Sequence, residues 1–211
     1  MNKGLFITIE GIEGVGKSTN LNFLHQHLSD KRIKVVCTRE PGGTIIAESI
    51  RQILLSHHNE VMTAETELLL LFAGRAQHVA SVIKPALRKG DWVICDRFTD
   101  ASYAYQGWGR GLSLKKISAL TQLILDNFVP DLTLLLDAPV ETSLKRLVQR
   151  GKKDRIEQED INFFQRVREG YLALAQQFPQ RFHVISANHP LEQVQSQIVH
   201  ALEPFFVTLI K

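Results

Sequence analysis

The residues best suited to chemistry form a glycine-rich loop near the N-terminus. Gly11, Gly16, Lys17 and Ser18 match the spacing G-x-x-x-x-G-K-[ST], directly after a β-branched apolar run at residues 5–9. Inward-pointing N–H groups and a helix N-terminus in such a loop hold polyphosphate. The lysine reaches the β- and γ-phosphates, and the hydroxyl coordinates Mg²⁺. The sequence therefore predicts an ATP-type site made of Gly11, Ile12, Glu13, Gly14, Val15, Gly16, Lys17, Ser18 and Thr19.

This loop is shared by GTPases, ATPase motors and small-molecule kinases, so other features must choose among them. The chain has no Asn-Lys-x-Asp segment for reading guanine, and 211 residues leave little room for motor insertions. Arginines stand where strands are expected to end and in a polar segment, which suits two phosphorylated ligands facing each other. These features favour a kinase. A binding or regulatory protein without turnover is the alternative class.

The loop must be positioned by a parallel sheet, because short apolar runs alternate with segments of helical period. Helical stripes include Leu21, Leu24 and Leu28, and a helix is expected to begin at Ser18. No linker or repeat divides the chain, so residues 1–211 are expected to form one α/β domain with a three-layer α/β/α arrangement. The five expected strands are residues 5–9, 34–38, 92–95, 132–136 and 183–185.

Composition limits the partners. Apolar residues make up 44% and charged residues 22%, as in ordinary globular proteins. The longest uncharged apolar run, residues 68–74, is far shorter than the roughly 20 residues of a membrane span. A net charge of +3 is too weak to indicate nucleic-acid binding. We therefore expect a soluble cytoplasmic protein, without membrane or nucleic-acid partners, in which Cys37 and Cys95 are reduced core thiols.

Five further motifs resemble those of bacterial thymidylate kinases, in matching order from the first strand to about residue 200. They are residues 38–44 (TREPGGT), 72–78 (FAGRAQH), 96–98 (DRF), 104–107 (AYQG) and 154–158 (DRIEQ). The resemblance implies the P-loop kinase fold, with a five-stranded parallel sheet and a short lid at about residues 149–160. The polar composition of that segment is typical of a mobile surface loop.

The resemblance also implies a reaction. ATP, with Mg²⁺, would donate its γ-phosphoryl group to the 5′-phosphate of thymidine monophosphate (dTMP), giving dTDP for dTTP biosynthesis. The acceptor phosphate is largely dianionic near neutral pH, so no general base is needed. A kinase for another nucleotide is the rival within enzymes. dUMP lacks only a methyl group, so we expect it to be a poorer substrate rather than an excluded one.

Catalytic roles follow from the same resemblance. Arg97 would contact the monophosphate and Asp96 would lie near the metal, although this pair could instead be a structural ion pair. Glu13 would pair with positive groups of the acceptor site or lid. Arg155 and Arg150 of the lid would stabilise the transferring phosphoryl group. The alternative for the neighbouring Lys152 and Lys153 is ordinary solvated surface.

The base and sugar of the acceptor would meet another set of residues. Arg75 is expected to hydrogen-bond thymine, with Ser102 and Gln106 at the base edge. Tyr105 would pack where a ribose 2′-hydroxyl would lie, which favours deoxynucleotides. Phe72 is expected to stack on the base or else to belong to the core, because the family often has an aromatic residue one position earlier, where Leu71 stands.

Glu40 and Pro41 are expected to wall the acceptor pocket, and Arg39 to neutralise the acceptor phosphate or pair with Glu40. The family forms homodimers, and the apolar segment 67–87 offers a dimer face or ordinary core. Trp108 falls in an expected flexible loop, where it would cap the acceptor site or face a partner subunit. His25, His27, His57 and His58 have no carboxylate or cysteine partners at metal-binding spacing, so we expect them to be surface or core histidines.

Overall fold

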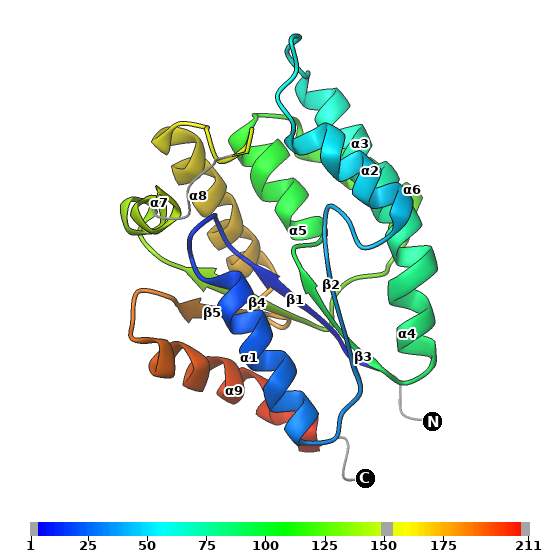
Figure 1. The fold of residues 1–211 in the computed structure, drawn as a ribbon, viewed down its shortest axis with the longest axis vertical. Helices are drawn as coiled ribbons and strands as arrows, with labels where there is room; N and C mark the ends of the chain where they lie inside the picture. Colours follow the sequence, from blue (N-terminus) through cyan, green and yellow to red (C-terminus); the bar gives the residue numbers. More distant parts are fainter. Residues whose placement is uncertain (1–3, 149–153, 208–211) are drawn as a thin grey trace.

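The protein is built on a sheet of five parallel strands. The structure is a computed structural model that describes residues 4–148 and 154–207, and Figure 1 shows how its elements are arranged. The strand order in the sheet is β2-β3-β1-β4-β5. The bounds are β1 Phe6–Glu10, β2 Val35–Arg39, β3 Trp92–Asp96, β4 Leu132–Asp137 and β5 Phe182–Ser186. Each predicted strand exists, with ends that differ by at most one residue, so the predicted five-stranded parallel sheet is confirmed.

All four strand pairings are parallel, so the carboxyl ends of the strands meet at one edge of the sheet. The chain leaves β1 at Glu10, β2 at Arg39 and β3 at Asp96. In open α/β sheets, ligands bind outside this edge. The predicted phosphate loop and the Asp96–Arg97 pair are thereby brought to the same place.

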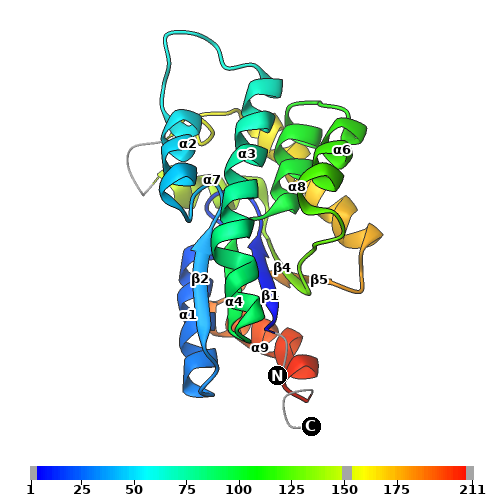
Figure 2. The same cartoon turned by 90° about the vertical axis from the view of Figure 1, so that its right-hand side faces the viewer.

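Helices cover both faces of the sheet. Helices α1 and α9 lie on one face, and α4, α5 and α8 lie on the other (Figure 1). Figure 2 shows α3 continuing into α4 along this second face, with α2 beside α3. The helices are α1 Lys17–Asp30, α2 Ile45–Leu55, α3 Ala64–His78, α4 Lys84–Arg88, α5 Thr99–Ser102, α6 Leu114–Leu125, α7 Val140–Val148, α8 Ile161–Gln177 and α9 Leu191–Val207, with the π-helical segments η1 Val79–Ile83 and η2 Tyr103–Gly109.

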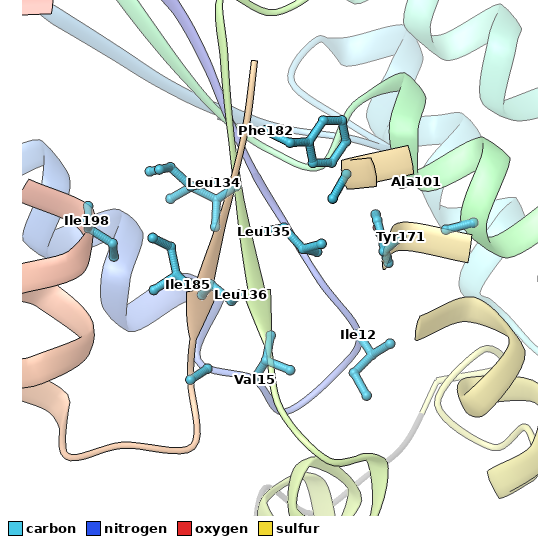
Figure 3. Close-up of a cluster of buried hydrophobic side chains, with 14 of the residues drawn as sticks. Ile12, Val15, Ala101, Leu134, Leu135, Leu136, Tyr171, Phe182, Ile185 and Ile198 are labelled. Atoms are coloured by element: carbon cyan, nitrogen blue, oxygen red, sulfur yellow. The ribbon is translucent and has the colours of Figure 1, made fainter. Parts of the chain in front are cut away.

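The core follows the alternation of side chains along the strands. In Figure 3, Leu134 lies on the side of the sheet that faces Ile198 of α9, whereas Leu135 lies toward Tyr171 of α8. Residues 132–136 of β4 are all buried, and all but Thr133 are leucine, as expected for a strand covered on both sides. This packing fixes α8, which was not predicted, against the sheet beneath the ligand-binding edge.

Two expectations about single residues are corrected. Cys37 is exposed because it is the middle residue of the edge strand β2, whereas Cys95 of β3 is buried; both are free thiols. Trp108 does not lie in a flexible loop: it belongs to η2, where its ring packs against Gly170 of α8. A Cβ atom at Gly170 would approach the indole to 2.7 Å, so glycine permits this contact.

Over residues 4–148 and 154–207, no helix is both long enough and apolar enough to cross a bilayer.

Candidate active site

The glycine-rich loop connects β1 to α1 and wraps tightly. Gly11, Gly14 and Gly16 have φ values of 133°, 78° and 95°, which only glycine adopts readily. Lys17 begins α1, and its ammonium donates to the carbonyl oxygens of Gly11 at 3.1 Å and Ile12 at 2.9 Å. Burial lowers the pKa of Lys17 to about 8, and the charge of Arg97 acts in the same direction. The loop therefore holds a desolvated positive charge that an anion would neutralise.

A hollow beside this loop, here called the P-loop hollow, contains the predicted magnesium ligands. Ser18 and Asp96 both line it, together with Gly14, Gly16 and Lys17. One carboxylate oxygen of Asp96, Oδ1, is buried and accepts no hydrogen bond from the described residues. A hydroxyl and a carboxylate oxygen are hard donors of the kind Mg²⁺ prefers. The residues present therefore fit the metal, although the described chain contains no cluster of three His, Cys, Asp or Glu residues around one point.

A second hollow, here called the inner pocket, lies next to the first. The two share five lining residues: Glu13, Glu40, Arg51, Arg97 and Asp154. The other residues of the inner pocket come from α2, α3, α5, η2, the segments that follow β2 and β3, and the segment after residue 153. They are Pro41, Leu54, Leu55, Glu67, Leu71, Arg75, Phe98, Ala101, Ser102, Tyr105, Gln106, Arg155 and Ile156. Two ligands bound in these hollows would therefore meet at Glu13 and Arg97.

Arg97 is held by both arms of its guanidinium. One arm donates to Glu13 at 2.8 Å and the other to the hydroxyl of Tyr171 at 3.0 Å. The guanidinium carbon lies 4.7 Å from the ring centre of Tyr105, whose hydroxyl also donates to Glu13, at 2.6 Å. The backbone of Arg97 has φ 69°, a left-handed conformation that costs about 1–2 kcal/mol for a residue other than glycine. The surrounding network therefore fixes this arginine where the two hollows meet.

Glu10 lies beneath this network, at the last position of β1. It accepts from the Tyr171 hydroxyl and from the Phe98 N–H, both at 2.7 Å. Burial raises the pKa of Glu10 to about 7, and the carboxylate of Asp100 adds to the increase. Arg97 and the two hydrogen bonds oppose it. Glu10 thus supports Tyr171, which in turn supports Arg97.

Arg75 and Glu40 form a buried ion pair on one wall of the inner pocket. The Arg75 Nε donates to Glu40 at 2.7 Å, and only 2% of Arg75 is exposed. A second donor of Arg75 reaches the Ser102 hydroxyl at 3.1 Å and a third reaches the Phe98 carbonyl, also at 3.1 Å. The pair is strongly oriented by these bonds, and a guanidinium with five N–H groups retains donors for a ligand.

Glu67 of α3 organises another part of the inner pocket. Its carboxylate accepts from the Gln106 amide at 2.7 Å, from Arg155 at 2.6 Å and from Arg110 at 3.3 Å. Burial pushes the pKa of Glu67 upward, but the charges of Arg110 and Arg155 and the Gln106 amide outweigh it, so the pKa is lowered. Glu67 is therefore ionised at neutral pH and ties the segment after residue 153 to η2.

Most of the predicted acceptor residues come together in the inner pocket: Glu40, Pro41, Arg75, Arg97, Ser102, Tyr105 and Gln106. Arg155, predicted as a lid arginine, also lines this pocket and not the P-loop hollow. Phe72 does not line it. This residue is 2% exposed and packs with Leu68 and Ile117, below the guanidinium of Arg75. Leu71 occupies the pocket wall instead, so the structure supports the alternative that Phe72 is core.

Arg39 lines the P-loop hollow but does not pair with Glu40, as one alternative expected. Its guanidinium donates to both carboxylate oxygens of Glu48, at 3.0 and 2.9 Å, because Glu40 is already bound by Arg75 and His78. Arg150, Lys152 and Lys153 lie outside the described residues.

Several residues of the site were not predicted, namely Glu10, Arg51, Glu67 and Tyr171. Glu10 carried a signal, since it is a carboxylate at the end of an otherwise apolar strand. Glu67 stands eight residues before Arg75, a spacing that places both near one face of a helix. Arg51 and Tyr171 carried no such signal in the sequence, because each reaches the site only through tertiary packing.

Comparison with known proteins identifies the family of this chain. The family model described as thymidylate kinase matches residues 9–198. A thymidylate kinase of Methylococcus capsulatus is 58% identical over 198 residues, which cover 94% of each chain. One of Vesicomyosocius okutanii is 52% identical over 94% of this chain and 97% of that protein. A crystal structure of thymidylate kinase from Ehrlichia chaffeensis superposes with a TM-score of 0.77 at 34% identity, over 95% of this chain and 99% of that one. The chain belongs to the thymidylate kinase family, whose members phosphorylate dTMP to dTDP with ATP.

Proposed function

We propose that ATP binds in the P-loop hollow and dTMP in the inner pocket, with the two phosphates meeting at Arg97. The observation that carries this assignment is that the two hollows share Arg97 and Glu13. A reaction between two bound ligands requires such a junction, because rate enhancement comes from holding the reacting groups in contact and in line.

On the donor side, the loop N–H groups, Lys17 and the N-terminus of α1 hold the polyphosphate. Ser18 and Asp96 hold Mg²⁺, which neutralises charge on the β- and γ-phosphates when bound. Glu13 has a different role from its neighbours: it accepts from Arg97 and Tyr105 and so fixes the junction. We assign Glu13 to positioning, within the predicted catalytic set of Glu13, Lys17, Arg97, Arg150 and Arg155.

The reaction needs cations rather than a base. An oxygen of the dTMP phosphate attacks the γ-phosphorus of ATP, and the bond from that phosphorus to the β–γ bridging oxygen breaks, leaving ADP. Arg97 neutralises charge on the transferring group, and Arg51 and Arg39 lie close enough to the P-loop hollow to assist. Preorganised cations of this kind supply the main stabilisation of such transition states.

The inner pocket recognises the nucleoside. Arg75, Ser102 and Gln106 offer hydrogen bonds to thymine, and Tyr105 packs against the sugar. Glu40 and Pro41 form part of the pocket wall, and Leu71, rather than Phe72, lies beside them in it.

The chain acts as one domain, with residues 149–160 as its lid. Within the described part of the lid, Arg155 donates to the Leu54 carbonyl at 2.9 Å and to Glu67 at 2.6 Å. Closure of a lid would exclude water and limit hydrolysis of ATP.

We also propose a cytoplasmic homodimer without nucleic-acid partners. Leu69 of α3 is 57% exposed and Leu123 of α6 is 77% exposed, on two helices that pack together. These side chains give a partner subunit apolar surface to cover. Light scattering of the wild type and of Leu123→Glu tests this: a dimer in the first and a monomer in the second are expected, and a monomeric wild type would refute it.

The proposed activity is tested by coupled ADP production with ATP, Mg²⁺ and each of dTMP, dUMP, dCMP, UMP and AMP. Strong turnover of dTMP, weaker turnover of dUMP and little of the others is expected. ADP release without any acceptor measures background hydrolysis. Turnover of a different monophosphate alone would overturn the pocket assignment, and equal ADP release with and without acceptors would overturn the kinase assignment.

A further inference from the structure

The side-chain amide of Gln106 has one satisfied end and one unsatisfied end. Its Nε2 donates to Glu67 at 2.7 Å. Its Oε1 is buried and accepts no hydrogen bond from the described residues, although Gln106 lines the inner pocket. A buried carbonyl oxygen without a donor destabilises the protein unless a ligand supplies one. Gln106 therefore presents an acceptor that awaits a donor.

The orientation of this amide is imposed by Glu67. An ionised carboxylate only accepts hydrogen bonds, so the NH₂ end of Gln106 must face it. Glu67 is itself held in place by Arg155 and Arg110, and both keep it ionised. The opposite orientation would bring the Gln106 oxygen against a carboxylate oxygen, which is repulsive.

The neighbouring wall presents donors. The Ser102 oxygen accepts from Arg75, which leaves the hydroxyl proton free to be donated, and Arg75 retains N–H groups beyond its three described bonds. The pocket thus combines donors from Arg75 and Ser102 with one acceptor from Gln106.

We propose that Glu67 is a positioning residue for base specificity: it fixes the Gln106 amide so that the pocket selects a pyrimidine carrying a 4-carbonyl and an N3–H. This inference rests on the proposed binding of dTMP in the inner pocket. Thymine and uracil offer an acceptor at C4 beside a donor at N3, which complements the donors of Arg75 and the acceptor of Gln106. In the same orientation, cytosine offers an amine at C4 and a lone pair at N3, so both contacts become repulsive.

The test is the substitution Glu67→Gln, with dissociation constants for dTMP, dUMP and dCMP measured by calorimetry. A glutamine at this position can also donate, so the Gln106 amide is free to turn and offer its NH₂ to cytosine. The ratio of dCMP to dTMP dissociation constants is expected to fall by about tenfold or more. The ratio of dUMP to dTMP dissociation constants should stay within twofold of its wild-type value, because both bases present the same hydrogen-bonding edge.

Glu159→Gln is the matched control. Glu159 also pairs with Arg110, at 2.5 Å, but makes no described contact with Gln106. The variant Glu159→Gln makes the same chemical change beside the same arginine, so its ratio of dCMP to dTMP dissociation constants should equal that of the wild type. An unchanged ratio in Glu67→Gln, or an equal fall in both variants, would overturn the proposal and leave Glu67 with a structural role.

A crystal structure of the wild type with dTMP tests the same point without a variant, in case Glu67→Gln does not fold. Gln106 should keep its contact with Glu67 and accept from N3–H. Rotation of Gln106 away from Glu67 on binding would contradict the proposal. Failure of the wild type to bind dTMP would instead overturn the proposed function, so the two failures are distinguishable.

Discussion

The P-loop hollow and the inner pocket share a boundary but are built in opposite ways. The loop that forms one side of the P-loop hollow consists of consecutive residues, 11–18, and Lys17 is held by two carbonyl oxygens of that loop. Residues from other elements, such as Arg39 and Asp96, complete this hollow. The inner pocket depends on ion pairs between distant residues, such as Glu40 with Arg75 and Glu67 with Arg155, which are 35 and 88 positions apart. The phosphate loop is therefore local, whereas the inner pocket is tertiary.

The difference also concerns charge. Lys17 is partly buried and its pKa is lowered to about 8; its described hydrogen bonds go to neutral carbonyl groups, although the charges of Asp96, Glu13 and Glu10 also act on it. Arg75, Arg97 and Arg155 each already have a hydrogen-bonded carboxylate partner. An ammonium without such a partner attracts any polyphosphate, whereas a paired arginine is fixed in direction and discriminates by shape. The donor site therefore provides binding strength, and the acceptor site provides selectivity.

The largest effect on this contrast is expected from removing the Lys17 ammonium. Lys17→Met keeps much of the side-chain length but loses the ammonium, so kcat/KM for ATP should fall by about a thousandfold or more. Steady-state ADP production measures it, with thermal unfolding as the control for folding. Activity within tenfold of the wild type would show that the loop N–H groups suffice without Lys17.

The second test concerns the tight backbone of the loop. Gly14→Ala places a Cβ atom 2.0 Å from the Ser143 carbonyl oxygen at φ 78°, so we expect a loss of roughly 3 kcal/mol in the free energy of unfolding. Gly111 has the same φ of 78° with nothing within 4 Å of the built Cβ. Gly111→Ala should therefore cost only about 1 kcal/mol. Denaturant unfolding compares the two, and equal losses would mean that backbone strain alone, without the clash, explains both.

The third test targets the junction of the two sites. A lysine in Arg97→Lys cannot hold Glu13 and Tyr171 with two fixed arms, so kcat should fall about 50-fold with a smaller change in KM. Arg181→Lys is the control, because Arg181 binds Asp100 with two arms but lines neither hollow. Rapid-quench measurement of the chemical step separates the two variants. A rise in KM at unchanged kcat would assign Arg97 to binding alone.

The same contrast explains what could be predicted from sequence. The five strands and the phosphate loop were predictable because each is specified by consecutive residues. The individual contacts of the inner pocket were not, since no local pattern pairs Glu67 with Arg155. Phe72 shows the limit most clearly. One residue along a helix corresponds to a rotation of about 100°, and that rotation places Leu71 in the pocket wall and Phe72 in the core.

The smallest expected effect is on the pH dependence of stability and comes from Glu10, which lies beneath Arg97 where the two hollows meet. Its pKa of about 7 in the folded protein lies above the ordinary value of 4.5, so between these pH values the folded state binds the proton and the unfolded state has lost it. Stability from this group therefore falls as pH rises, by roughly 1.5 kcal/mol between pH 5.5 and 7.

In Glu10→Gln the proton can no longer be lost, so this part of the pH dependence should disappear. The variant should therefore become more stable relative to the wild type as pH rises across the same interval, so its free energy of unfolding minus that of the wild type should increase. Urea titrations at several pH values measure this difference. A constant difference would mean that Arg97 and Tyr171 keep Glu10 ionised throughout. Glu10 would then be a charged partner of the Arg97 network rather than a carboxyl group kept protonated by burial.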